Sequence, residues 1–272
     1  STSRYLTAAE VKLRCEATNQ PIIVAGNPLL QYYKTLMDQS DENRLKLEDQ
    51  YASWGNTVKN FGGMNEAVEK NHLIDEKKAE EARFREFAQK SGKTEYKDVI
   101  DRIEKLCEAY SDTLHDATLM RIALQDQDLW IRPSLVDAYE KALKSGKEKD
   151  ITVAKQAIMD YCKQQNFSLD KVIDCGKVRL LVPYFIKERK LKEMPHFLET
   201  KESTEQIIGT MYANTVFADS AKLADALAKN DASVLKADPL YKEISDIFEY
   251  SNKTFKGFSA YTKQRLELNK IY

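Results

Sequence analysis

The sequence predicts an all-α protein in which long helices pack antiparallel. Glycine and proline, the residues that most often end helices, number only 9 and 6 in 272 residues. Apolar side chains recur three and four residues apart through several long stretches, which is the spacing of one face of an amphipathic helix. Hydrophobic residues make up 42% and charged residues 31% of the chain, enough to bury a core beneath a well-solvated surface.

The first expected helix begins at Ala8, with Thr7 as its N-cap, and runs to about Ala17. The sequence PIIVAGNP follows, and its Ile22–Val24 fits either a short strand or an apolar loop packed beneath the helices. Pro28 is expected as the first residue of the next helix, where a backbone N–H would have no partner in any case.

Helical signals then continue from Leu29 to about Lys90. Breaks are expected near Ser40-Asp41 and Gly62-Gly63, and Ser91-Gly92 is expected to end the last helix of this stretch. The glycine pair should loosen or kink its helix, because each glycine in a helix costs about 1 kcal/mol relative to alanine.

The rest of the sequence predicts helices separated by proline, glycine and capping residues. In chain order they are Tyr96 to about Leu129, Ser134 to about Lys144, Ile151 to Gln165, a segment capped by Ser168, Thr204 to about Asn214, a helix capped by Asp219 or Ser220 that ends near Lys229, and a last helix from Asp238-Pro239 to Tyr272. Pro183 lies in the most apolar window and is expected to kink a helix or to separate two helices.

The charge balance restricts the classes of partner. Lys and Arg number 42 and Asp and Glu 43, a net charge of −1 with His neutral, which argues against nucleic acid and against an anionic membrane as partner. No apolar run approaches the roughly 20 residues that span a bilayer. The polar start STSRYLTAAE is no signal peptide and lacks an initiator Met, so we expect a cytosolic protein, a processed one or a fragment.

Neither a metal site nor a catalytic motif is predicted. The four cysteines form no CxxC pair and only three histidines are present, so zinc-ligand spacing is missing and no cofactor is expected. GxSxG, HExxH, GxGxxG and P-loop patterns are absent as well. Cys162 and Cys175 could pair across a helix hairpin in an oxidising compartment, but buried free thiols are the favoured interpretation.

One stretch, residues 47–65, has two contrasting helix faces. Its apolar side chains are spaced 4, 3, 4 and 3 residues apart along a single seam, which consists of Leu47, Tyr51, Trp54, Val58 and Phe61. Small and amide side chains fall on roughly the opposite face, which consists of Ser53, Asn56, Asn60 and Gly63. We therefore expect the first face to pack against the protein and the second to line a cleft.

Asn56 is the candidate binding residue on the second face. An amide carbonyl accepts hydrogen bonds, and a protonated α-amine has three donors and no acceptor, so the two groups are complementary. Asn60, one turn further on, offers a second polar group. The alternative interpretation is that both are exposed helix amides, or residues of a kink near the glycines.

The sequence resembles a family of bacterial dipeptidyl peptidases, the type 7 and type 11 group. The resemblance rests on TSRYLT at the start, on QYASWGNTVKNFGGMN followed by KKAEEARF, and on VFADSAKL, DPLY and LNKIY later in the chain. It implies a serine exopeptidase with a chymotrypsin-like double β-barrel into which an all-α domain is inserted. Residues 1–272 would be this single cap domain, with 1–6 and about 265–272 as the joins to a barrel that the sequence does not contain.

The same resemblance implies which functional residues of the peptidase lie in this chain and which lie outside it. The catalytic His and Asp of the family precede the helical domain and the nucleophilic Ser follows it, so this chain alone should be inactive and should contain no catalytic residue. A motif resembling NYWKN holds the α-amine of the substrate, and its first Asn matches Asn56 in NTVKN. Thr57 and Val58 depart from the motif, and Trp54 could compensate one turn earlier. Asn60 matches the second Asn, so Asn56 and Asn60 are the predicted substrate-binding residues.

The resulting hypothesis is a helical domain that caps the cleft of a dipeptidyl peptidase and recognises the free N-terminus of its substrate. Its partners would be an oligopeptide and the catalytic barrel of the same chain, with no nucleic acid, membrane or metal involved. The resemblance further implies a periplasmic or secreted parent with a removed signal peptide, and it allows a homodimer. The rival hypothesis is a stand-alone helical module that binds partner helices along its apolar seams.

Overall fold

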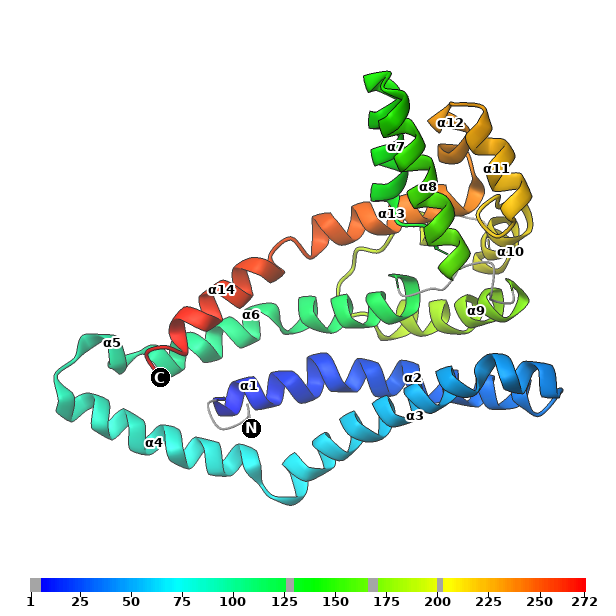
Figure 1. Cartoon of the computed structure of the whole chain (residues 1–272). Helices are drawn as coiled ribbons and strands as arrows, with labels where there is room; N and C mark the ends of the chain where they lie inside the picture. Colours follow the sequence, from blue (N-terminus) through cyan, green and yellow to red (C-terminus); the bar gives the residue numbers. More distant parts are fainter. Residues whose placement is uncertain (1–5, 126–129, 166–170, 200–202) are drawn as a thin grey trace. The chain divides into compact units, whose positions relative to one another are not determined.

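The computed structural model describes residues 6–125, 130–165, 171–199 and 203–272. Within these ranges every regular element is a helix and no strand is formed, which confirms the predicted all-α class with long antiparallel helices (Figure 1). None of the helices described is both long enough and apolar enough to cross a membrane.

The chain divides into two compact units. The first, unit 1, comprises the chain up to Leu119 together with Glu188–Lys192 and Thr254–Tyr272. Unit 2 comprises Met120–Lys187 and Glu193–Lys253. The interpretation of residues 1–272 as one cap domain, with joins to a barrel at both ends, stays a prediction.

Unit 1 begins with a continuous helical run that contains α1 (Ala8–Leu13), the π-helical turn η2 (Arg14–Asn19) and α2 (Gln20–Met37). Thr7 caps α1 as predicted, because its hydroxyl accepts a hydrogen bond from Glu10 N and the Glu10 carboxylate accepts one from Thr7 N. In η2 the bonding pattern lengthens, and the N–H of Gln20 donates to the C=O of Cys15.

The predictions for residues 21–28 were wrong. Ile22–Val24 forms neither a strand nor a loop but part of α2, and Pro28 lies inside that helix instead of starting it. The helix continues because the side chains on one of its faces are buried at helical spacing; these are Ile22, Ala25, Leu29 and Tyr33. Their burial outweighs the roughly 3 kcal/mol that an interior proline costs.

The next helix, α3 (Asp41–Lys70), follows α2 after a short turn, and the two form an antiparallel hairpin (Figure 1). The predicted break before Asp41 is confirmed, with Ser40 as the N-cap. The predicted break at Gly62-Gly63 was wrong, since α3 runs through both residues without interruption. The helix ends instead at Lys70, with Asn71 as its C-cap, and His72 then takes a left-handed conformation with φ 50°.

Three further helices complete the first half of unit 1: α4 (Leu73–Ser91), α5 (Thr94–Lys97) and α6 (Val99–Met120). Gly92, with φ 69°, ends α4 where the sequence predicted. The predicted Tyr96–Leu129 helix is shorter than expected, because α6 passes at Arg121 into a π-helical turn, η3 (Arg121–Gln125). Leu129 lies outside the described residues.

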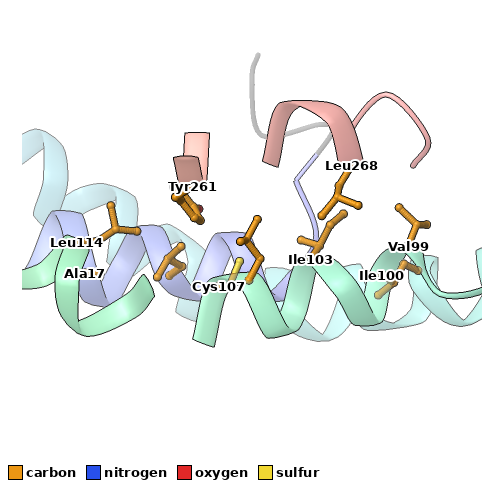
Figure 2. Packing of buried hydrophobic residues seen from close by; sticks show 10 residues of the cluster. Ala17, Val99, Ile100, Ile103, Cys107, Leu114, Tyr261 and Leu268 are labelled. Carbon is orange, nitrogen blue, oxygen red and sulfur yellow. The ribbon is translucent and has the colours of Figure 1, made fainter. Parts of the chain in front are cut away.

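The core of unit 1 joins α1, α6 and α14 (Phe258–Leu268), as Figure 2 shows. Its buried members are Leu13, Ala17, Val99, Ile100, Ile103, Leu106, Cys107, Leu114, Tyr261 and Leu268. Tyr110 of α6 packs beside Tyr261, with ring centroids 5.3 Å apart. Gly257 leaves room for this ring, because a Cβ on Gly257 would lie 3.1 Å from Cε1 of Tyr110.

Glu10 ties the two ends of the sequence together within unit 1. Its side chain is 3% exposed, and its Oε1 accepts hydrogen bonds from Arg265 Nε at 2.7 Å and Asn269 Nδ2 at 3.1 Å. A charge removed from water needs such partners, because burial of an unpaired carboxylate is costly. Packing and ion pairing therefore hold α14 against α1.

Unit 2 contains α7 (Pro133–Ser145), α8 (Glu148–Gln165), α9 (Lys171–Glu188), η4 (His196–Leu198), α10 (Thr204–Asn214), α11 (Ser220–Ala228), α12 (Ala232–Lys236) and α13 (Pro239–Thr254). The predicted stop of α7 at Ser145-Gly146 and the Asp219 cap of α11 are confirmed. Pro183 lies inside α9, so no helix junction forms there. Ser168, the predicted cap of this segment, lies outside the described residues.

The predicted last helix from Asp238 to Tyr272 was wrong, because it is two helices. α13 ends at Thr254 and α14 begins at Phe258. The interruption falls at Gly257, where the chain passes against the ring of Tyr110.

A chain of buried polar groups crosses unit 2. Trp130 Nε1 donates to the Tyr212 hydroxyl at 3.1 Å, and this hydroxyl donates to Asp174 Oδ2 at 2.6 Å. Lys177 Nζ lies 3.2 Å from Asp174 Oδ1, and both of these charged side chains are almost fully buried. Burial, followed by the nearby Asp174 carboxylate, raises the pKa of Tyr212 well above its usual value.

The cysteines are free thiols, as favoured from the sequence, and Cys107, Cys162 and Cys175 are buried. Burial raises the pKa of the Cys162 thiol to about 12, and it has the same effect on Cys107, where the Glu10 charge adds to it. The disulfide considered between Cys162 and Cys175 is not formed.

We expect Glu10→Ala to lower the free energy of unfolding by about 3 kcal/mol, because it leaves Arg265 without its buried partner and removes the α1 capping box. The control is Glu267→Ala in α14, which removes an exposed ion pair to Lys270 just beyond that helix and should cost less than about 0.5 kcal/mol. Chemical denaturation of both variants checks this, and equal losses would contradict the role given to Glu10.

We also expect alkaline pH to destabilise unit 2 through Cys162. The thiol has a pKa of about 12 when folded, against an ordinary value of 9.0, so above pH 9 the unfolded chain releases a proton that the folded chain keeps. Stability should therefore fall between about pH 9 and 12, by up to about 1.4 kcal/mol per pH unit from this group. Cys162→Ala should show a shallower fall in denaturation midpoints; parallel pH curves would contradict the assignment.

Candidate functional site

Helix α3 has the two faces that the sequence predicted. On the packing seam Leu47 is fully buried and Tyr51, Trp54, Val58 and Phe61 are half-buried. On the opposite side Ser53, Asn56, Asn60 and Gly63 are all exposed, and we call these four residues the amide face. The helix thus presents polar groups to solvent from a backbone that is held by its other side.

The middle of the seam packs on α2 at a position without a side chain. Gly26 is buried in α2, and a Cβ built there would lie 3.3 Å from Trp54 Cε3. One turn along α2, Leu30 approaches Gly55, whose Cβ would lie 3.9 Å from Leu30 Cδ2. These contacts place the segment of α3 that carries Asn56.

Hydrogen bonds anchor both ends of α3. At the start, Ser40 Oγ accepts from Asn43 N at 3.1 Å, and Asn43 Nδ2 donates to the C=O of Leu36 at 3.1 Å. Near the far end, Asn65 Oδ1 accepts from Asn19 Nδ2 at 2.7 Å and Asn65 Nδ2 donates to the C=O of Cys15 at 3.4 Å. These bonds help to explain why α3 stays helical beyond Gly62-Gly63.

Asn56 and Asn60 are exposed, and neither amide has a hydrogen-bond partner among the residues that the structure describes. They lie one turn apart, about 6 Å along the helix axis. Their carbonyl oxygens are therefore available to donors from outside the chain. The charged residue between them is Lys59, which is exposed, so the four residues of the amide face offer hydrogen-bond acceptors but no negative charge.

The expectation that this face lines a cleft is not met within the chain. Asn56 and Asn60 line none of the five cavities that we identify among the described residues. The nearest in sequence is a cavity of about 270 Å³, to which α3 contributes Met64. Asn65 of α3 lines a second cavity, of about 440 Å³, in unit 1. The amide face is an open surface, and a closed binding site there requires a second wall from elsewhere.

A buried carboxylate beside that cavity escaped the sequence analysis. Asp116 is 1% exposed and accepts hydrogen bonds from the backbone N–H groups of Lys190 and Leu191 at 2.8 Å each. His115 Nδ1 lies 2.9 Å from the same carboxylate. Helical spacing gives no signal for it, because its backbone partners lie more than 70 residues away in the sequence. Across the described residues, no three His, Cys, Asp or Glu side chains gather closely enough to hold a metal ion.

The helical fold matches part of the solved structures of Porphyromonas endodontalis DPP11. The structure of Porphyromonas endodontalis DPP11 in complex with the dipeptide Arg-Glu superposes on 99% of this chain and 39% of that chain, with a TM-score of 0.79 and 16% sequence identity. Another structure of DPP11 from the same organism, in complex with substrate, gives a TM-score of 0.74 and 15% identity over 99% of this chain and 38% of that chain.

Sequence comparison gives the family. All residues from 1 to 272 match peptidase S46, and the chain belongs to this family. Dipeptidyl-peptidase 7 of Phocaeicola vulgatus is 27% identical over 282 residues, covering 100% of this chain and 39% of that protein. Dipeptidyl-peptidase 7 of Porphyromonas gingivalis is 36% identical over 106 residues, which are 39% of this chain and 15% of that protein.

The resemblance to type 7 and type 11 dipeptidyl peptidases is thereby confirmed, and the chain spans 39% of the length of the Phocaeicola vulgatus relative. The assignment of Asn56 and Asn60 to substrate binding stays a prediction, to which the structure adds that both amides are exposed on one anchored helix.

We expect Asn56→Ala and Asn60→Ala to leave the stability of the chain within about 0.5 kcal/mol of the wild type, because neither side chain is buried or bonded to a described residue. Asn65→Ala should instead cost about 1–3 kcal/mol, since it breaks two hydrogen bonds between α3 and η2 and leaves the buried Asn19 amide without this acceptor. Thermal and chemical denaturation separate the two classes, and a large loss for Asn56→Ala would give that residue a structural role instead.

Proposed function

We propose that this chain is the substrate-capping helical part of a serine dipeptidyl peptidase and that its amide face holds the free α-amine of the peptide substrate. The observation that carries the proposal is the pair of exposed amides, Asn56 and Asn60, one turn apart on a helix that is anchored by its opposite face. Membership of peptidase S46 and the two dipeptidyl-peptidase 7 relatives support the reaction class.

The chemistry of the face fits one half of an amine site. An ammonium group donates three hydrogen bonds, and the Asn56 carbonyl can accept one of them, with Asn60 as the second acceptor. The face contains no carboxylate, and Lys59 lies beside it, so these amides alone would hold an ammonium ion weakly. The remaining acceptors, and the wall that excludes water, would come from the catalytic part of the parent chain.

In this proposal the domain sets where the peptide begins. A cap that holds the α-amine at a fixed distance from the nucleophile admits two residues before the scissile bond and rejects blocked N-termini. Closure over the substrate would orient the bond and exclude water. A serine outside this chain would then attack the carbonyl carbon, activated by a His and Asp that also lie outside it.

Location and assembly belong to the same proposal. We place the parent enzyme in the periplasm or outside the cell, and a homodimer is compatible with it. The rival hypothesis is a stand-alone interaction module. No specific contact among the described residues favours it. The match of the whole chain to 39% of a dipeptidyl peptidase supports the first hypothesis instead.

In the full-length peptidase that contains this chain, we expect Asn56→Ala to lower kcat/KM for substrates with a free N-terminus by about 10- to 100-fold. A lost hydrogen bond to a charged group is worth about 1.5–3 kcal/mol, and each 1.4 kcal/mol corresponds to a factor of about ten. The informative quantity is the ratio of kcat/KM for a free dipeptidyl substrate to that for its N-acetylated form, which should fall.

The control for this experiment is Asn252→Ala, which removes another exposed helical asparagine, in α13 of unit 2, and should leave the ratio unchanged. An unaltered ratio in the Asn56→Ala enzyme would refute the assignment of the amide face to amine recognition.

A further inference from the structure

We propose that Gly26 is a positioning residue for Asn56: its missing side chain sets how closely α3 packs on α2 and thereby where the amide face lies. The inference rests on the function proposed above for Asn56. It assigns a specificity role to a buried glycine that contacts no substrate itself.

The contact at Gly26 is tighter than any other glycine contact in the two helices. A Cβ on Gly26 would overlap Cγ2 of Val58 and would lie 3.3 Å and 3.4 Å from Cε3 and Cζ3 of Trp54. Non-bonded carbons prefer about 3.5–4.0 Å, so even a methyl group would push the seam of α3 outwards. Helices α2 and α3 can pack this closely only because residue 26 has no side chain.

The backbone at Gly26 is not the reason for a glycine. Positive φ angles among the described glycines occur at Gly92 and Gly146, whereas Gly26 is an ordinary helical residue within α2. A glycine inside a helix is less favourable than alanine, so alanine would suit the backbone better. Space, and not conformation, excludes a side chain here.

The two side chains that pack against Gly26 lie on either side of Asn56 in the sequence. Trp54 precedes it by two residues and Val58 follows it by two, and both lie on the seam directly behind the amide face. The ends of α3 are held to neighbouring elements separately, through the bond of Asn43 to the C=O of Leu36 and through Asn65. A side chain at position 26 would therefore displace the middle of α3, where Asn56 lies, while the ends of the helix stay in place.

The other glycines of α3 provide matched controls. A Cβ on Gly55 would make an ordinary contact with Leu30 Cδ2 at 3.9 Å, and a Cβ on Gly62 would meet nothing within 4 Å. Gly62→Ala thus tests the general effect of replacing a helical glycine in α3 without disturbing its packing on α2.

The experiment compares Gly26→Ala, Gly26→Ala with Val58→Ala, and Gly62→Ala in the full-length peptidase. A displacement near 1 Å can reduce catalysis by as much as about a hundredfold. We expect Gly26→Ala to lower kcat/KM for a free dipeptidyl substrate by about tenfold, mainly through KM, and to reduce its ratio to the N-acetylated substrate. Adding Val58→Ala removes the obstructing Cγ2 and should restore most of the ratio, and Gly62→Ala should leave it unchanged.

The outcomes separate the two proposals. If Asn56→Ala reduces the amine ratio and Gly26→Ala does not, the positioning role of Gly26 is overturned while the proposed function stands. If neither changes the ratio, the proposed function itself falls. If Gly26→Ala lowers activity equally for both substrates and Val58→Ala restores nothing, Gly26 serves only the fold. Should Gly26→Ala fail to fold, Val58→Ile enlarges the same contact from α3 and should reduce the ratio, and an unchanged ratio would overturn the proposal.

Discussion

The buried carboxylate of Glu10 is the constraint on which unit 1 depends. It completes the capping box that starts α1, and it also receives hydrogen bonds from Arg265 and Asn269 of the α14 segment, more than 250 residues later. The apolar core of this unit also joins α1, α6 and α14. The charge allows only the arrangement that brings both partners to it, because an unpaired carboxylate cannot remain buried.

In unit 1 the position of the amide face is set by contacts that other residues of α3 make. Asn56 and Asn60 make no hydrogen bonds with the described residues around them. Their position is set by the packing of the opposite face of α3 on α2. The Gly26 contact fixes how closely the helix packs on α2, and hydrogen bonds of Asn43 and Asn65 hold its two ends. In the proposed function, the polar groups that receive the substrate amine are thus free of internal bonds, while the bonds that locate them are made elsewhere on the same helix.

Helical period predicted most of the fold and both faces of α3, because burial on one side of a helix repeats every three to four residues. It failed where a local signal competed with distant packing. Pro28 and the Gly62-Gly63 pair have low helix propensity, but the burial of Leu29 and Tyr33 and the bonds of Asn65 keep both segments helical. The hydrogen bonds of Asp116 to Lys190 and Leu191 span more than 70 residues, and spacing carries no trace of them. Likewise, Gly26 could not be recognised without knowing which residues of α3 face it.

The division of the chain has a consequence for the order in which it can fold during synthesis. Unit 2 consists of residues that all precede Thr254, so its helices are complete before translation ends. Unit 1 begins with the first helix but needs Tyr261, Arg265 and Leu268 to close its core. Helices α1 and α6 are therefore synthesised well before they reach their final packing, and in the meantime Leu13, Ala17 and the apolar face of α6 lack their cover from α14. At 5–20 residues per second, roughly, the interval between α6 and α14 lasts on the order of ten seconds, a period in which chaperones could act on this chain.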